Sequence, residues 1–178
     1  RSIMTEKIAR RGYHIYREYG VDPLERHYVD EVMTRTVDAI DANLTVRDAL
    51  AGWFGATQTR RAYPVVEDGA VLGVVDRAML EHLRAGHAGD ASSQTLADVL
   101  HTHSAVFALA DETCRLVATR LAVHGLERLA VVTDMDSRRL VGIVSRSDLV
   151  KPSIAHFEEE HKRERFRRLR PRFGKRHS

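Results

Sequence analysis

The sequence predicts an α+β fold made of two α/β repeats that pack as a pair about a pseudo-twofold axis. The stretch "VLGVVDRAML" at residues 71–80 is echoed by "LVGIVSRSDL" at residues 140–149, and each runs from an apolar strand through a glycine into a helix start. The two glycines, Gly73 and Gly142, lie 69 positions apart. This spacing is too long for a solenoid repeat and too short for a comfortable independent domain, so both copies are expected to build one core together.

The first half of each repeat is predicted to contain a short helix, a short strand and an amphipathic helix. The short helix and strand are expected in "DEVMTRTVDAI" at 30–40 and in "ADVLHTHSAVF" at 97–107. Residues 44–57 and 112–125 each begin with an acidic or threonine-containing cap region and then repeat small and apolar residues at spacings of three and four. That pattern is typical of an amphipathic helix.

The second half of each repeat is predicted to contain two apolar strands joined by an acidic turn, followed by a helix. The strands are "YPVV" (63–66) and "LGVV" (72–75) in the first copy, and "LAVV" (129–132) and "VGIV" (141–144) in the second. Such apolar strands need cover on both faces. The two helices of a repeat can cover one face of its own sheet, and the sister repeat can cover the rest.

These patterns predict five segments along the chain. Residues 85–95 are rich in glycine, alanine and serine and are therefore expected to form a linker. The predicted segments are an N-terminal arm at 1–28, the first repeat at 29–84, the linker at 85–95, the second repeat at 96–150 and a basic C-terminal helix and tail at 151–178.

Charge is distributed unevenly over the 178 residues. Residues 29–150 hold 12 Lys and Arg against 17 Asp and Glu, whereas residues 151–178 hold 10 against 4. A basic body would suggest a nucleic-acid-binding face, and because only the tail is strongly basic, no nucleic-acid partner is expected. The apolar runs are far shorter than the roughly 20 residues that cross a bilayer, so the fragment itself is expected to be soluble. Its single cysteine, Cys114, excludes an internal disulfide and fits a reducing cytosol.

The repeated order of strand, acidic turn, strand and "GIVSRSDL" resembles a tandem pair of cystathionine-β-synthase (CBS) domains. The resemblance covers residues 29–150. It implies a compact regulatory module that forms homodimers through its CBS pairs. It also implies a cleft between the copies that holds an adenine nucleotide (ATP, ADP or AMP) as a regulatory ligand, with no cofactor required.

The N-terminal flank "TEKIARRGYHIYREYGVDPLERHYVDEVM" (5–33) resembles the cytosolic connector of CLC chloride channels and transporters. The marks are "RRG" at 10–12, "DPLE" at 22–25 and "DEVM" at 30–33. Because the chain starts with neither Met nor a secretory signal, it is expected to be cut from a longer protein. The resemblance then implies a bacterial CLC-type chloride channel or chloride/proton antiporter. Residues 1–28 would connect its membrane domain to this module at the cytoplasmic face of the inner (plasma) membrane. The alternative is a free-standing CBS sensor, or an accessory module of another transporter or enzyme.

Two polar residues of the second copy form the candidate ligand site. The strand that contains Gly142 delivers Ser145 to a helix N-terminus, where its hydroxyl can cap free backbone N–H groups. Asp148 lies one helical turn further on the same side, and a carboxylate beside a hydroxyl suits the two adjacent hydroxyls of a ribose. The resemblance likewise implies that Asp148 holds ribose. The alternative is that Ser145 and Asp148 only cap the helix and complement its dipole.

The resemblance implies that the adenine packs against the first copy. The matching positions are Arg60 and Arg61 before the second strand, with Val37 and Asp38 on the first strand. An arginine there can stack on a purine or bind a phosphate, or can instead pair with an acidic residue and fill the cleft.

The first copy departs from this pattern. Asp76 replaces the serine and Met79 replaces the aspartate. The mirror cleft therefore lacks the ribose acceptor, and at most one of the two clefts is expected to bind.

No catalytic or metal-binding constellation is predicted. The histidines of "HTH" at 101–103 would point the same way on a strand and could begin a metal site, but no third ligand follows at a telling spacing. Cys114 begins a helix, yet its counterpart in the first copy is Val46, which favours a buried apolar role. No nucleophile, base and orienting group can be assembled, so the chain is not expected to be an enzyme.

Two further segments carry predictions. Trp53 and Phe54 are expected to pack in the core or between the copies, with a homodimer surface as the alternative. The tail predicts a helix over 153–169, stopped before Pro171 and supported by Glu158–Lys162, Glu159–Arg163 and Glu164–Arg168 pairs. It is interpreted as a solvated extension, with contact to anionic lipid as the alternative.

Overall fold

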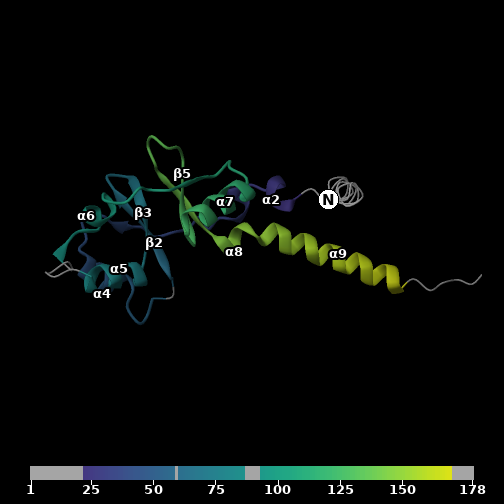
Figure 1. The fold of residues 1–178 in the computed structure, drawn as a ribbon, viewed down its shortest axis with the longest axis horizontal. Coiled ribbons are helices and arrows are strands. Elements are labelled where there is room, and N and C mark those ends of the chain that lie inside the picture. The colour runs from purple at the N-terminus through teal and green to yellow at the C-terminus, as the bar shows by residue number, and fades with distance from the viewer. Residues whose placement is uncertain (1–21, 59, 87–92, 170–178) are drawn as a thin grey trace, which may run out of the picture.

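The protein is described here by a computed structural model that covers residues 22–58, 60–86 and 93–169. Both repeats contain the predicted order of helix, strand, helix, strand, strand, helix (Figure 1). The first comprises α3 (Val29–Val32), β1 (Ile40–Asp41), α4 (Val46–Trp53), β2 (Ala62–Glu67), β3 (Ala70–Asp76) and α5 (Arg77–Ala85). The second comprises α6 (Leu96–Leu100), β4 (Ala108–Leu109), α7 (Cys114–His124), β5 (Arg128–Val132), β6 (Leu140–Ser145) and α8 (Arg146–Leu149). The short helix α2 (Pro23–Arg26) precedes them and the long helix α9 (Lys151–Leu169) follows.

Parts of four predicted segments lie outside the described residues. They are 1–21 of the N-terminal arm, residue 59 of the first repeat, 87–92 of the linker and 170–178 of the tail.

Threonine caps begin the amphipathic helices of both repeats, as the sequence pattern predicts. The hydroxyl of Thr45 accepts a hydrogen bond from the backbone N–H of Asp48, and the hydroxyl of Thr113 accepts one from that of Leu116. These bonds satisfy backbone donors that the first helical turn leaves without partners. Helix α7 is capped at its C-terminus by Gly125, whose φ of 63° is a left-handed conformation that suits glycine.

Each repeat forms its own three-stranded sheet, in the orders β1-β2-β3 and β4-β5-β6. In both sheets the first pair of strands is parallel and the second is antiparallel. The register shifts between Val65 and Val66 in β2, and at the equivalent place between Val131 and Val132 in β5. The sequence repeat is therefore a structural repeat down to its irregularities.

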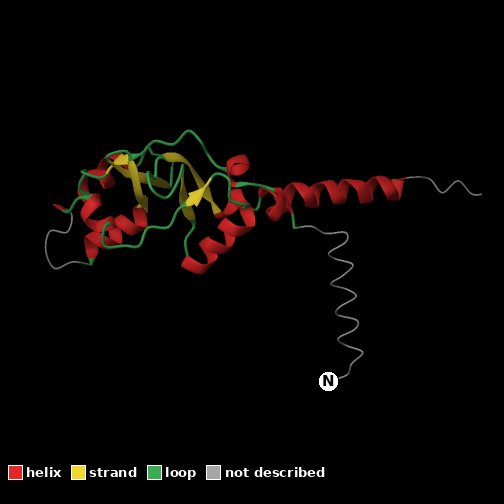
Figure 2. Ribbon diagram, turned by 90° about the horizontal axis from the view of Figure 1, so that it is seen from above, coloured by secondary structure: helices red, strands yellow, loops and turns green. Residues whose placement is uncertain are grey.

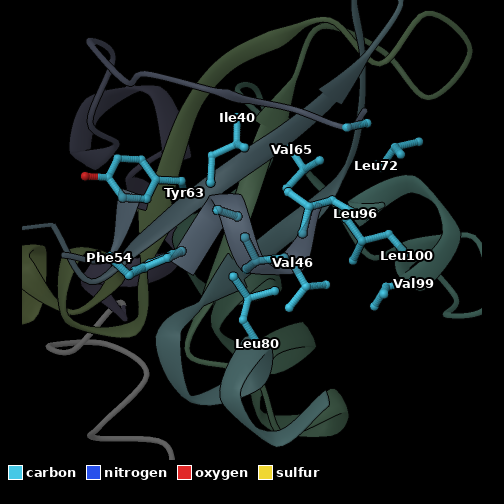
Figure 3. Packing of buried hydrophobic residues seen from close by; sticks show 13 residues of the cluster. Ile40, Val46, Phe54, Tyr63, Val65, Leu72, Leu80, Leu96, Val99 and Leu100 are labelled. Carbon is cyan, nitrogen blue, oxygen red and sulfur yellow. The ribbon is translucent and has the colours of Figure 1, made fainter. Parts of the chain in front are cut away.

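The first helix of each repeat packs into the core of the other repeat. Val29 of α3 and Met33 just after it lie in a cluster with residues of α7 and β5, while α6 contributes to the first copy's cluster. Figure 3 shows Leu96, Val99 and Leu100 beside side chains of the first copy. The other two helices of each repeat, α4 and α5 in the first and α7 and α8 in the second, pack in their own repeat's cluster. The prediction that two helices and the sister repeat together cover each sheet is therefore confirmed.

Backbone hydrogen bonds hold this exchange in place. The N–H of Val46 donates to the carbonyl of Gln94, and that of Leu96 donates to the carbonyl of Leu44, both at 2.9 Å. At the equivalent place in the other half of the pair, the N–H of Val29 donates to the backbone carbonyl of Glu112, and that of Cys114 donates to the backbone carbonyl of His27, again at 2.9 Å. Because the segment before one repeat's first helix pairs with the segment before the other repeat's amphipathic helix, the two copies interlock.

A third, smaller apolar cluster joins the two sheets. It consists of Val71, Phe107, Ala130 and Val132, with partly buried residues around it. The N–H of Val71 also donates to the carbonyl of Arg138 at 2.8 Å, and the guanidinium of Arg138 lies 5.8 Å from the centre of the Phe107 ring. The expected shared core is thus three adjoining clusters rather than one.

Gly142 lies where the exchanged α3 segment meets β6. Thr34 and Ile143 exchange two backbone hydrogen bonds of 2.9 and 3.0 Å across this contact. A Cβ at Gly142 would lie 2.6 Å from the carbonyl oxygen of Thr34 and 3.1 Å from the sulfur of Met33. A Cβ at Gly73 would meet Leu100 at 3.6 Å, an ordinary contact. Both repeats carry the glycine, but close approach requires it only in the second.

Trp53 and Phe54 take part in the core of the first copy. The ring of Tyr63 receives both in edge-to-face contacts, with centroids 4.9 Å from Trp53 and 5.5 Å from Phe54. Phe54 is buried and Trp53 is partly buried against the same cluster. The prediction of core packing is confirmed.

The segments that enter and leave the two repeats both contact the second copy. Leu24 of α2 is buried in its core, and the Asp22 carboxylate pairs with Arg115 of α7 at 2.6 Å. Helix α9 begins directly after α8 and projects away from the repeats (Figure 2). Pro23 and His27 share a cavity of about 240 Å³ with Pro152 and His156.

The tail helix begins two residues before the predicted start. Its described side chains form a His156–Glu160 pair of 3.1 Å and a stacked contact between Phe157 and His161, whereas the predicted Glu158–Lys162 and Glu159–Arg163 pairs are not formed. Exposed ion pairs add little free energy, so helical spacing alone does not ensure them. The third predicted pair involves a side chain outside the described residues. In the described part of the chain, no helix has the length and apolar character needed to cross a bilayer.

Candidate functional site

A cavity of about 300 Å³ opens between the two copies, and residues of both repeats form its wall. Its lining residues are Thr34, Arg60, Arg61, Ala62, Arg128, Ile143, Ser145 and Asp148. Four of the six predicted site residues, Ser145, Asp148, Arg60 and Arg61, therefore lie around one opening although they are far apart in the sequence.

Ser145 and Asp148 cap α8 reciprocally. The Ser145 hydroxyl accepts a hydrogen bond from the Asp148 N–H at 3.2 Å, and the Asp148 carboxylate accepts one from the Ser145 N–H at 3.0 Å. The other carboxylate oxygen lies 2.9 Å from the amino group of Lys151. Capping is therefore present in the structure, and a ligand would have to bind alongside it.

Asp148 is charged at neutral pH. Burial disfavours its ionised form, but hydrogen bonds from Lys151 and Ser145 outweigh that effect and hold the pKa of Asp148 below its usual value. An ionised carboxylate only accepts hydrogen bonds, and its oxygens offer about four lone-pair sites. Two are used here, so Asp148 can still accept from a pair of ligand hydroxyls that enter the cavity.

The arginines reach the cavity from the loop before β2. Arg60 donates a hydrogen bond of 3.0 Å to the carbonyl of Thr36, which ties its side chain to the segment before β1. Ala62 begins β2 and pairs with Asp76 in β3. The antiparallel register thus places Arg61 close to the start of α5 as well as to the cavity.

The prediction that Val37 and Asp38 lie on the first strand is wrong. Strand β1 contains only Ile40 and Asp41, because its parallel pairing with β2 begins at Ile40. Val37 and Asp38 lie in the segment before it, and neither lines the cavity.

Sequence reasoning missed Thr34 and Arg128. Thr34 reaches the cavity because the exchanged α3 segment is hydrogen-bonded to Ile143 of the other repeat. Arg128 lies there because it pairs with Ser145 across β5 and β6. The register of β5 on β6 was available as a signal for Arg128, whereas the exchange of α3 leaves no mark in the sequence.

The mirror position in the first copy lacks a ribose acceptor, as the sequence predicts. Asp76 caps α5 by accepting a hydrogen bond of 2.8 Å from the N–H of Met79. Met79 is partly buried against the first copy's core. The cap is retained in this copy, and an apolar side chain stands at the position of Asp148.

The two histidines of 101–103 follow α6 in a turn, so the geometry expected for a strand is not realised. His101 lies 3.1 Å from a Glu67 carboxylate oxygen, and a ring nitrogen of His103 lies 3.0 Å from the Val99 carbonyl. Within residues 22–58, 60–86 and 93–166, no three metal-binding side chains come together.

Cys114 is fully buried in the second copy's core, which confirms its predicted apolar role. Burial, with a smaller contribution from Glu31, raises the pKa of its thiol to about 11.

Comparison with protein families identifies both repeats. The family model of the CBS domain matches residues 29–83 and 96–153. No curated protein matched the chain.

Solved structures of similar fold include three CBS proteins. One is CBSX2 in complex with AMP, with 22% sequence identity and a TM-score of 0.59 over 74% of this chain and 98% of that one. The CBS domain of a bacterial CNNM/CorC family Mg²⁺ transporter in complex with ATP has 21% identity and a TM-score of 0.57 over 74% and 89%. A CBS-domain-containing protein from Agrobacterium tumefaciens has 22% identity and a TM-score of 0.55 over 71% and 98%. At these identities the likeness establishes the fold.

Proposed function

The chain belongs to the CBS domain family, and from this premise we propose that it is a regulatory module that binds an adenine nucleotide between its two repeats. The observation that carries the proposal is the meeting of Ser145 and Asp148 from one copy with Arg60 and Arg61 from the other around one cavity. A ligand there contacts both copies at once.

The chemistry of the cavity fits a nucleoside. The ionised, half-buried Asp148 accepts hydrogen bonds from the two ribose hydroxyls, and Ser145 lies beside it. An arginine of the loop before β2 stacks on the purine. The complexes of CBSX2 with AMP and of the transporter domain with ATP support this ligand class.

Regulation would act by population shift. A nucleotide that touches both repeats favours the arrangement in which Asp148 and the arginines have the right separation. The change can reach α9 because Lys151, its first residue, pairs with the ligand-binding carboxylate of Asp148. A ligand that uses the remaining acceptor sites of Asp148 therefore lies next to that pair.

Calorimetric titration tests the proposal directly. ATP, ADP and AMP are each titrated into the purified chain, into Asp148→Ala and into Met79→Ala. Saturable binding of at least one nucleotide is expected in the wild type. It should be lost in Asp148→Ala and retained in the Met79→Ala control, which alters the mirror position. Absence of heat with all three nucleotides in the wild type would sink the proposal.

We further propose that the host is a bacterial CLC-type chloride channel or chloride/proton antiporter. The resemblance of residues 5–33 supports it, although 5–21 lie outside the described residues. The seating of α2 beside the start of α9 suits a connector that carries a regulatory signal. The alternative is a free-standing sensor or an accessory module of another protein. The parent reading frame decides: hydrophobic spans directly before Arg1 support the CLC host, and their absence refutes it.

Self-association is proposed to use the exposed face of α7. Leu116 and Val123 on that helix, together with Leu126 just after it, are 50%, 75% and 36% exposed and follow one another at spacings of seven and three. A second copy would cover this apolar face. Sedimentation of the wild type and of Val123→Glu tests it, with a dimer expected only for the wild type.

The tail is proposed to contact anionic lipid. Lys162, Arg163 and Arg165 are exposed on α9, and Phe157 and Phe166 are 66% and 74% exposed. Basic residues near an anionic surface add about 1 kcal/mol each. Co-sedimentation with phosphatidylserine vesicles but not phosphatidylcholine vesicles is expected, and equal binding to both would contradict this contact.

A further inference from the structure

A second, larger cavity adjoins the candidate nucleotide site. Its volume is about 600 Å³, and Arg60, Arg61 and Arg128 line both cavities. The larger cavity adds Arg77, the first residue of α5. The antiparallel pairing of Ala62 with Asp76 brings the loop before β2 next to the start of α5, and pairing of Arg128 with Ser145 brings β5 to the nucleotide side. Four arginines therefore line the two adjoining cavities where the two copies meet.

These positive charges are poorly compensated. Among the described side chains, no carboxylate forms an ion pair with Arg61, Arg77 or Arg128. The larger cavity contains two carboxylates, and both interact elsewhere. Asp76 accepts the N–H of Met79 at 2.8 Å, and Glu127 faces Arg146 at 3.8 Å. Like charges held together without partners repel one another, so an anion that joins them gains favourable energy.

We infer that this arginine cluster, Arg60, Arg61, Arg77 and Arg128, binds the phosphate chain of the nucleotide and makes the site selective for a triphosphate over a monophosphate. The inference rests on the proposed function, because it takes the ribose to be held by Asp148. From the ribose, the phosphate chain of the nucleotide then extends along the three arginines that both cavities share. Guanidinium groups bind phosphate oxygens in pairs, which gives both charge and geometry.

Arg77 distinguishes the nucleotides. It lines only the larger cavity, whereas Asp148 lines only the smaller one. A single phosphate next to the ribose is satisfied by the shared arginines and leaves Arg77 unused. Only a longer phosphate chain extends into the larger cavity, so the gain from Arg77 belongs to ATP and is absent for AMP.

The test is calorimetric titration of ATP, AMP and adenosine into the wild type, Arg77→Gln and Arg139→Gln. Arg139 is the matched control, because it is an exposed arginine that lines neither cavity. In the wild type ATP should bind about tenfold more tightly than AMP. Arg77→Gln should lower the affinity for ATP by about tenfold and change the affinity for AMP by less than about twofold. Arg139→Gln should change neither affinity. Arg77 is exposed at a helix start, so the variant should fold, and circular dichroism checks this.

The outcomes separate this inference from the function on which it rests. If the wild type binds AMP and ATP with equal affinity, or if Arg77→Gln lowers both affinities equally, the inference of triphosphate selectivity is wrong, whereas the proposal of nucleotide binding stands. If no nucleotide binds but inorganic tripolyphosphate does, the nucleotide function fails and the cluster is an anion site of another kind. Raising the salt concentration gives an independent readout. It should weaken the binding of ATP more than the binding of AMP, because screening acts on each added phosphate charge.

Discussion

Replacement of Gly142 by alanine probes the place where the exchanged α3 segment crosses the second sheet. The added Cβ would lie 2.6 Å from the carbonyl oxygen of Thr34, so the two must separate by at least about 0.4 Å to reach the 3.0 Å below which Cβ contacts essentially do not occur. Met33 restricts the movement from the other side, since its sulfur would be 3.1 Å from the new atom. Moving Thr34 away stretches the two hydrogen bonds that it exchanges with Ile143.

The expected loss follows from these contacts. Overpacking a tight site costs about 1–3 kcal/mol, and the two weakened hydrogen bonds, worth about 1 kcal/mol each when intact, bring the total to about 2–4 kcal/mol. Gly73→Ala is the matched control in the first repeat, where the new Cβ meets Leu100 at an ordinary 3.6 Å. That substitution should be neutral or stabilise by up to about 1 kcal/mol, because alanine loses less backbone entropy on folding.

Urea unfolding followed by circular dichroism measures both free energies of unfolding. The m-value should stay unchanged, so that the shift of the midpoint reports stability alone. If the free energies of unfolding of Gly142→Ala and Gly73→Ala agree within about 0.5 kcal/mol, close approach does not explain the glycine at position 142, and the reasoning from the Thr34 contact is refuted.

Three further outcomes are expected. Burial opposes ionisation of Glu112, but hydrogen bonds from Arg120 and the Leu109 N–H outweigh it and lower its pKa from 4.5. Glu112→Gln should therefore lower the free energy of unfolding by about 1–3 kcal/mol at pH 7. The difference should shrink as pH falls below about 4.5 and through the lowered pKa, because the wild type then loses the same charge. A pH-independent difference would contradict this. Lys151→Met should raise the pKa of Asp148, as seen by NMR titration of its carboxyl carbon; an unchanged value would mean that the ion pair is absent in solution. Cys114 should react with a thiol reagent at pH 7 only after unfolding, and fast reaction of the folded chain would contradict its burial and raised pKa.

Several features were predictable because they depend on neighbours in sequence. The Ser145–Asp148 capping pair and its Asp76 counterpart follow from residue types at a helix start, and the structure shows both. The tail helix was predicted to within two residues at its start, whereas its expected ion pairs were not formed, since exposed side chains gain little from pairing. The misplacement of Val37 and Asp38 came from carrying a strand over from a resemblance when β1 has only two residues.

By itself, the sequence determined the two-repeat architecture, the order of elements and the loss of the ribose acceptor in the first copy. Periodicity and capping are local properties, which can be read along a chain. Only the tertiary structure decided that α3 and α6 exchange cores, that Thr34 and Arg128 line the site, and that Arg77 lies next to the shared arginines. Those facts depend on which segments pair across the pseudo-twofold axis. Because both repeats offer nearly equivalent partners, that pairing is decided by the fit of side chains in the packed core rather than by pattern.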